Sequence, residues 1–95
     1  IFKKGEKITC IGKRAFKNRQ LTTVVIPEGL DGLIIEEGAF QDNQIEKVFI
    51  PEGVKEIDTY AFKNNRIRYI EFPGTLKKIG NNAFSDNGLI FYREL

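Results

Sequence analysis

A four-fold internal repeat is the feature that most restricts what this chain can fold into. An alanine-phenylalanine pair recurs with successive alanines 24, 22 and 22 residues apart, at Ala15-Phe16, Ala39-Phe40, Ala61-Phe62 and Ala83-Phe84. Around this pair the units follow the pattern I-x-x-x-A-F-x-x-N-x-(L/I)-x-x-(V/I)-x-(I/F)-P. One such unit cannot bury enough apolar surface alone, whereas stacked units share a continuous core. The repeat therefore predicts a solenoid.

The second half of each unit is the predicted strand. It begins at Leu21, Ile45, Ile67 or Leu89, is rich in β-branched residues and alternates near its end. In the first three units it stops at Pro27, Pro51 and Pro73, because proline has no N–H for a continuing ladder. Asn or Asp stands two residues after each phenylalanine, and such side chains bond the backbone of turns. The remainder is expected to be an irregular connector or a short helical turn.

These elements predict an α/β-type repeat solenoid of mostly short parallel strands, that is, a right-handed leucine-rich-repeat solenoid of about four coils. Residues 1–95 are expected to form one domain, with units at about 8–27, 28–51, 52–73 and 74–95. The longer first step places a two-residue insertion between Glu28 and Ile34. We expect it to be a loop without a binding role, because short loop insertions cost little. Cys10 is expected to be buried or half-buried.

The combined pattern of I-x-x-x-A-F-x-x-N and L-x-x-V-x-I-P resembles the bacterial surface-antigen type of leucine-rich repeat, the BspA-like family. The resemblance extends over about residues 8 to 92. Members often have cysteine where this chain has Asn43, Asn65 and Asn87, and the last unit, ending Tyr92-Arg93-Glu94-Leu95, lacks the I-P ending. The resemblance implies a secreted or surface-attached protein that binds host proteins, cells or matrix, although a fold alone does not determine function.

The composition excludes several kinds of catalytic and metal-binding site. The chain has no histidine, a single cysteine, Cys10, and a single serine, Ser85. A serine–histidine or cysteine–histidine nucleophile, a histidine-containing zinc site and an internal disulfide therefore cannot form within it. We expect no enzyme activity, no metal and no cofactor.

Residues between the apolar positions of each strand should point outward. There the chain carries Val25, Phe49, Tyr69 and Phe91, interleaved with Lys47, Arg68 and Arg93. Aromatic residues and arginine are enriched at binding hot spots, and an exposed apolar stripe often marks an interaction surface. These residues are predicted to form a binding face, with the aromatic rings as anchors. The alternative is that they only stabilise the sheet through cross-strand pairs.

Charge is unevenly distributed along the chain, although its formal sum is only +2. The net charge is +6 over residues 1–20, −6 over residues 21–56 and +2 over residues 57–95. A basic end can dock on an acidic partner or a polyanionic glycan, but we favour the simpler interpretation that opposite charges meet between adjacent coils. No nucleic-acid recognition motif accompanies the charge, and no apolar run is long enough for membrane insertion.

The sequence thus predicts a non-catalytic binding module of a bacterial protein, located extracellularly or at the cell surface. Its strand face would recognise a protein or glycan ligand, such as host matrix or cell-surface material. The alternative is a structural spacer or assembly domain that has no ligand of its own. The apolar ends, Ile1-Phe2 and Ile90-Phe91-Tyr92, also predict that isolated copies form a homodimer through uncapped ends.

Overall fold

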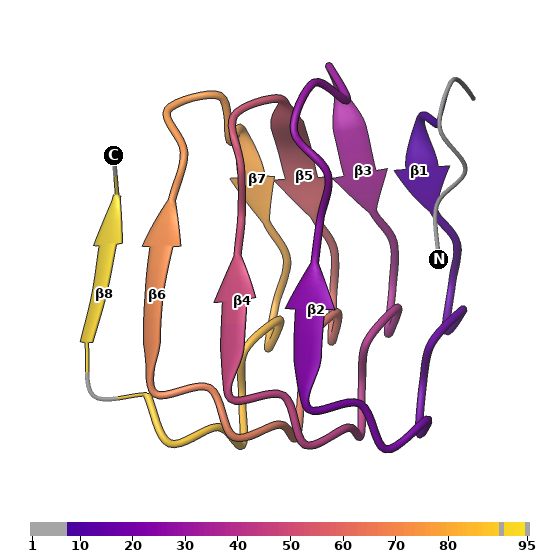
Figure 1. Cartoon of the computed structure of the whole chain (residues 1–95), viewed down its shortest axis with the longest axis vertical. Coiled ribbons are helices and arrows are strands. Elements are labelled where there is room, and N and C mark those ends of the chain that lie inside the picture. Colours follow the sequence, from indigo (N-terminus) through magenta and orange to yellow (C-terminus); the bar gives the residue numbers. More distant parts are fainter. Residues whose placement is uncertain (1–7, 90, 95) are drawn as a thin grey trace.

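A computed structural model describes residues 8–89 and, as backbone only, residues 91–94. Within this part of the chain every regular element is a strand. The strands are β1 (Cys10–Ile11), β2 (Thr23–Val25), β3 (Leu33–Ile35), β4 (Lys47–Phe49), β5 (Val54–Ile57), β6 (Tyr69–Phe72), β7 (Lys78–Ile79) and β8 (Phe91–Glu94). The chain winds through them so that successive strands alternate between two layers (Figure 1).

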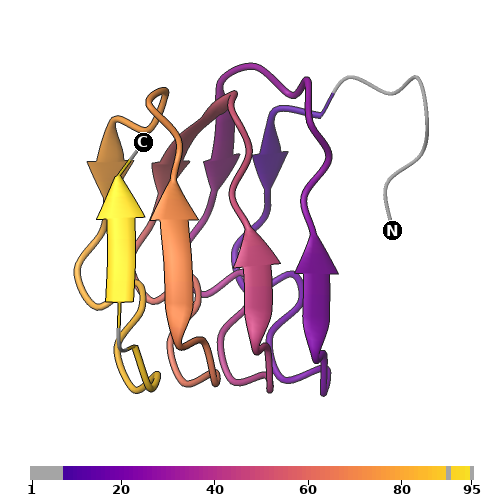
Figure 2. The same cartoon turned by 60° about the vertical axis from the view of Figure 1, so that its left-hand side comes forward.

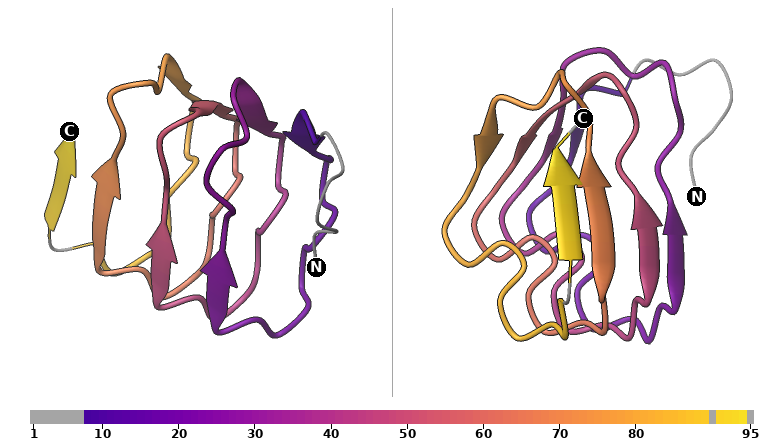
Figure 3. Two further views of the ribbon diagram at one scale, coloured as in Figure 1. Left: turned by 45° about the horizontal axis from the view of Figure 1, so that its top comes forward. Right: turned by 90° about the vertical axis from the view of Figure 1, so that its left-hand side faces the viewer.

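All strand pairings are parallel, but the two layers are built differently. The odd-numbered strands form one continuous sheet in the order β1-β3-β5-β7. The even-numbered strands form two separate pairs, β2-β4 and β6-β8, on the opposite side of the molecule (Figure 2). Strands of the two layers run in opposite directions, and β1 and β8 lie at opposite ends of the stack (Figure 3). The predicted solenoid of short parallel strands is confirmed.

The odd-numbered strands occupy segments where the sequence predicted only a connector. β3 and β5 bury both of their end residues, which are Leu33 and Ile35 in β3 and Val54 and Ile57 in β5. The inserted residues after Glu28 lie in the turn before β3. Where β3 pairs with β5, the register shifts between Leu33 and Ile34, and the extra residue, Lys55, belongs to β5. The even-numbered strands are shorter than predicted, since β2 and β4 begin two residues after the expected start. Between strands the described residues form bends and turns, with no helical turn.

A column of stacked phenylalanine rings fills the space between the layers. The ring centroids of Phe16, Phe40, Phe62 and Phe84 are 5.4, 5.1 and 5.2 Å apart in succession, and the planes are within 11° of parallel. Ala39 and Ala61 are fully buried beside the rings. Their small side chains let adjoining turns approach, and the Phe40 N–H donates to the Ala61 carbonyl at 2.7 Å. The alanine-phenylalanine pair that recurs in the sequence therefore forms two adjacent columns through the stacked units.

A column of asparagines ties each turn to the one before it. The side-chain amide of Asn65 donates to the carbonyl oxygens of Phe40 and Phe62, each at 2.9 Å. Its Oδ1 accepts the N–H of Ile45 at 3.0 Å. Equivalent bonds to the preceding turn are made by Asn43 and Asn87. The column therefore satisfies backbone groups in bends that lack regular secondary structure.

Two residues in each bend adopt the left-handed backbone conformation. The predicted column of Asn and Asp has φ values of 54°, 62°, 59° and 58° at Asn18, Asp42, Asn64 and Asp86. Short polar side chains make this conformation less costly than other side chains do. A second left-handed column stands directly before the repeated alanines, with φ values of 52°, 63°, 61° and 57° at Arg14, Gly38, Tyr60 and Asn82. The sequence analysis did not predict this second column.

Candidate binding face

The outward residues of the even-numbered strands form the candidate face. β2 and β4 each bury the middle residue and expose the two beside it, and β6 buries Ile70 while exposing Tyr69. The outward orientation predicted for five residues is therefore confirmed, namely for Val25, Lys47, Phe49, Arg68 and Tyr69. The side chains of the other two predicted residues, Phe91 and Arg93, lie outside the described part of the structure. Their backbones pair with Tyr69 and Glu71.

Three large apolar or aromatic side chains are strongly exposed on this face. Val25 is 80% exposed, Phe49 58% and Tyr69 53%. Val25 and Phe49 are direct partners in the β2-β4 register. Tyr69 instead takes the repeat position of Lys47, two residues earlier along the strand. The exposed apolar and aromatic side chains therefore follow a step across the face.

A groove of about 910 Å³ runs over these strands. It lies across β2, β4 and β6, and so spans the boundary between the β2-β4 pair and the β6-β8 pair. Its lining residues are Thr23, Val24, Val25, Glu46, Lys47, Val48, Phe49, Arg66, Arg68, Tyr69, Ile70 and Glu71. Five of the seven predicted face residues are among them. Glu46 and Glu71 belong to the outward residues expected from the sequence but not to the predicted binding residues. Arg66 was not predicted at all, although it stands two residues before the predicted Arg68.

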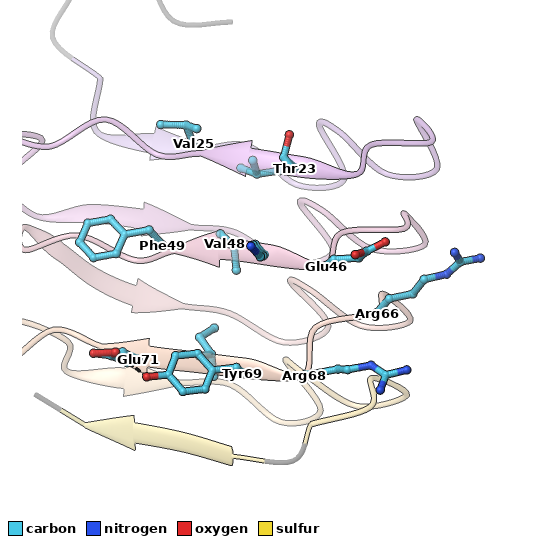
Figure 4. A pocket seen from close by; sticks show the side chains of 12 residues that line it. Thr23, Val25, Glu46, Val48, Phe49, Arg66, Arg68, Tyr69 and Glu71 are labelled. Atoms are coloured by element: carbon cyan, nitrogen blue, oxygen red, sulfur yellow. Dashed lines mark hydrogen bonds between the residues drawn. The ribbon is translucent and has the colours of Figure 1, made fainter.

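The groove has an apolar half and a charged half (Figure 4). Val25 and Phe49 are the last residues of β2 and β4, and the Tyr69 ring extends from the start of β6 toward Glu71. Arg66 and Arg68 extend away from these side chains, beyond the amino ends of the strands. Tyr69 Oη donates a hydrogen bond to Glu71 Oε1 at 2.8 Å. This bond provides the phenol with an acceptor, and 53% of Tyr69 is exposed.

The cations of the groove form no ion pair with the carboxylates that the structure describes. Among the described side chains one ion pair forms, between Lys78 Nζ and Asp58 Oδ1 at 3.7 Å. The exposed side chains of Lys47, Arg66 and Arg68 thus have no ion-pair partner within that part of the structure. The favoured expectation that opposite charges meet between adjacent coils holds for a single pair of described residues.

Other candidate features do not join this face. Cys10 is exposed, not buried, because it is the outward residue of β1 while Ile11 points into the core. No residue of the insertion 28–34 lines the groove. The described residues contain no cluster of His, Cys, Asp or Glu that could hold a metal ion. Nor does any helix that could cross a membrane occur in residues 8–89 or 91–94.

The parallel strands are stacked in two layers, and successive repeats contribute residues to a phenylalanine, an alanine and an asparagine column. This architecture defines a solenoid repeat protein of the leucine-rich class. A comparison with protein families agrees with this class. The BspA type leucine-rich repeat region matches residues 2–90 in six copies, so the chain belongs to the BspA-type leucine-rich repeat family. The family consists of repeat modules that are often associated with bacterial surfaces. Neither the curated proteins nor the solved structures that were compared include a significant match.

Proposed function

We propose that this chain is a non-catalytic binding module of a bacterial surface or secreted protein, and that it recognises a protein or glycan through the groove on its even-numbered strands. The observation that carries the proposal is the exposure of Val25, Phe49 and Tyr69 within one groove. Burying such side chains against a ligand removes apolar surface from water. Phe49 and Tyr69 are the proposed anchors, and Lys47 and Arg68 are proposed to orient the ligand.

The rival interpretation of the same residues is that they stabilise the sheet through cross-strand pairs. Val25 and Phe49 are such a pair. The exposed fractions of 80% and 58% favour a ligand, because a pair that served packing alone would cover more of its own surface. A double substitution of exposed residues distinguishes the two roles. It would weaken ligand binding if the residues form a binding face, and it would weaken folding if they only stabilise the sheet.

The test is a binding screen of the purified chain against matrix proteins, host-cell glycans and cell-wall polymers. A variant with Phe49→Ser and Tyr69→Ser is screened beside it, after circular dichroism has shown that it is folded. The matched control is Ile79→Ser, which removes another exposed apolar side chain (44% exposed) from the odd-numbered layer.

Binding by the parent and the control, but not by the double variant, would support the proposed face. Equal binding by all three proteins would place recognition elsewhere on the molecule. If no ligand in the screen is bound, the structural spacer becomes the better proposal, since a spacer needs no ligand of its own.

A further inference from the structure

The charge of the groove narrows the class of ligand. Lys47, Arg66 and Arg68 are exposed and have no ion-pair partner among the described residues. Against these three cations the groove has two carboxylates, Glu46 and Glu71, so its charged side chains sum to +1. The excess of positive charge favours a ligand with carboxylates, which a guanidinium can bind through two parallel hydrogen bonds.

The apolar half distinguishes a peptide from a sugar. Val25 and Phe49 offer no side-chain donor or acceptor, and the Tyr69 hydroxyl already donates to Glu71. A sugar can stack the C–H face of its ring on Phe49 or Tyr69, but hydroxyls turned toward Val25 and Phe49 would lose water without gaining hydrogen bonds, and that desolvation is unfavourable. An aliphatic or aromatic side chain of a peptide has no such cost.

The spacing of the two halves also suits an extended chain. In the repeat, Phe49 corresponds to Glu71, which stands three residues after Arg68. At a rise of about 3.3 Å per residue, the positions of Phe49 and Arg68 are about 10 Å apart along the strands. An extended peptide covers that distance in the same number of residues. A ligand with an acidic residue about two to four positions from an apolar one would reach both halves.

We propose that this groove binds an extended acidic segment of a partner protein. The carboxylates of the segment bind Lys47, Arg66 and Arg68, and a nearby apolar side chain packs on Phe49 and Tyr69. This inference rests on the proposed function of the groove and adds the chemical class of its ligand.

The test measures fluorescence anisotropy with two labelled synthetic peptides and with labelled heparin. The first peptide joins an Asp-Glu-Asp run to Gly-Leu-Phe, and the second has Asn-Gln-Asn in place of the acidic run. Three proteins are compared first. They are the unchanged parent, the arginine variant with both Arg66→Glu and Arg68→Glu, and the aromatic variant with both Phe49→Ser and Tyr69→Ser. The matched control is Lys55→Glu with Lys77→Glu, which makes the same change of net charge at exposed residues of the opposite layer.

The parent and the lysine control are expected to bind the acidic peptide equally. The arginine variant and the aromatic variant should each bind it about tenfold more weakly or worse, as at an interface hot spot. The amide peptide should bind weakly to every protein.

Three results would overturn the inference while leaving the proposed face in place. The first is equal binding of the acidic peptide by the parent and the arginine variant, with loss in the aromatic variant. The second is binding of heparin but not of the peptide, which would assign the cations to a sulfated glycan. The third is a dimer in sedimentation velocity that the arginine variant loses, which would make the occupant a second copy. If the aromatic variant binds every probe as the parent does, the proposed function itself fails.

Discussion

Asn65 is almost completely buried, yet its amide group is fully bonded. Its two N–H groups and its oxygen bridge Phe40, Phe62 and Ile45, which belong to two successive turns. No buried side-chain nitrogen or oxygen of the described residues lacks a hydrogen-bond partner. Because the bends have no regular ladder at this position, the side chain supplies the bonds that the backbone would otherwise lack.

Replacement of Asn65 by alanine is expected to lower the free energy of unfolding by about 1 to 3 kcal/mol, because the Ile45 N–H becomes unsatisfied inside the protein. The Phe40 and Phe62 carbonyls each keep one donor, the side-chain amides of Asn43 and Asn87. Urea denaturation followed by circular dichroism measures this loss. The control is Asn81→Ala at an exposed bend position, where a change within about 0.5 kcal/mol is expected. An Asn65→Ala variant as stable as the control would mean that water replaces the amide without cost.

Gly80 and Gly12 stand at the same position of the repeat, one residue after Ile79 and Ile11, but their surroundings differ. A Cβ at Gly80 would lie against the backbone nitrogen of Thr59, far inside contact distance. A Cβ at Gly12 would find its nearest neighbour, a carboxylate oxygen of Glu36, at 4.0 Å.

We therefore expect Gly80→Ala to destabilise the protein by about 1 to 3 kcal/mol, as overpacking does. Gly12→Ala should be neutral or stabilising by up to about 1 kcal/mol, since alanine lowers the entropy of the unfolded chain. Thermal unfolding of both variants measures the difference. Equal effects would show that the turn around Gly80 can move away from Thr59.

Only one of the two left-handed columns could be predicted from residue types. The column that contains Asp42 is all Asn or Asp, whose turn chemistry is familiar. The column before the alanines contains Arg14, Gly38 and Tyr60 and shares no side-chain property. There the conformation is held by backbone bonds to the next turn, such as Gly38 N–H to the Thr59 carbonyl at 3.0 Å. Bonds of this kind leave no signature in the sequence.

At the scale of the strands, the two layers should differ in rigidity. β5 is paired on both edges, with β3 and β7, whereas β4 is paired as a strand only with β2 in the described part of the chain. The boundary between β4 and β6 is also where the groove lies. A layer divided at this groove can change its shape more easily than a continuous sheet.

Hydrogen exchange measured by mass spectrometry should therefore show slower exchange for the segment of β5 than for that of β4. Exchange from paired backbone requires local opening, and a strand held on two edges opens less often. The exchange of β3, which is also paired on both edges, serves as an internal control. If β4 exchanges as slowly as β5, the two even-numbered pairs are joined in solution.

The sequence predicted the even-numbered strands but missed the odd-numbered ones, for a physical reason. In β5 only the end residues Val54 and Ile57 are buried, and charged Lys55 and Glu56 separate them, so no alternation is visible. The step in the exposed rings was predictable. Phe49 stands nine residues after its repeat phenylalanine, whereas Tyr69 stands seven after its own. The groove was not predictable, because it lies where β4 and β6 do not pair as strands, and the repeat pattern is the same on both sides of that boundary.

At the scale of the whole molecule, charge contributes little to holding the turns together. The described side chains form one ion pair, and both partners, Lys78 and Asp58, retain solvent contact. Exposed pairs of this kind contribute at most about 1 kcal/mol. Stability comes instead from the apolar core between the layers and from the asparagine column. The exposed cations of the groove therefore remain available for a ligand.

Sodium chloride should consequently affect folding and binding differently. Raising its concentration from about 0.1 to 1 M shortens the screening length from about 10 Å to about 3 Å. The unfolding free energy is expected to change by less than about 1 kcal/mol, since few ion pairs support the fold. Over the same range the acidic peptide should bind about tenfold more weakly or worse, because Lys47, Arg66 and Arg68 attract it through solvent-exposed charge. Chemical denaturation and anisotropy at each concentration measure the two quantities. A parallel loss of both would mean that charge stabilises the stacked turns, and that the groove cations serve the fold rather than a ligand.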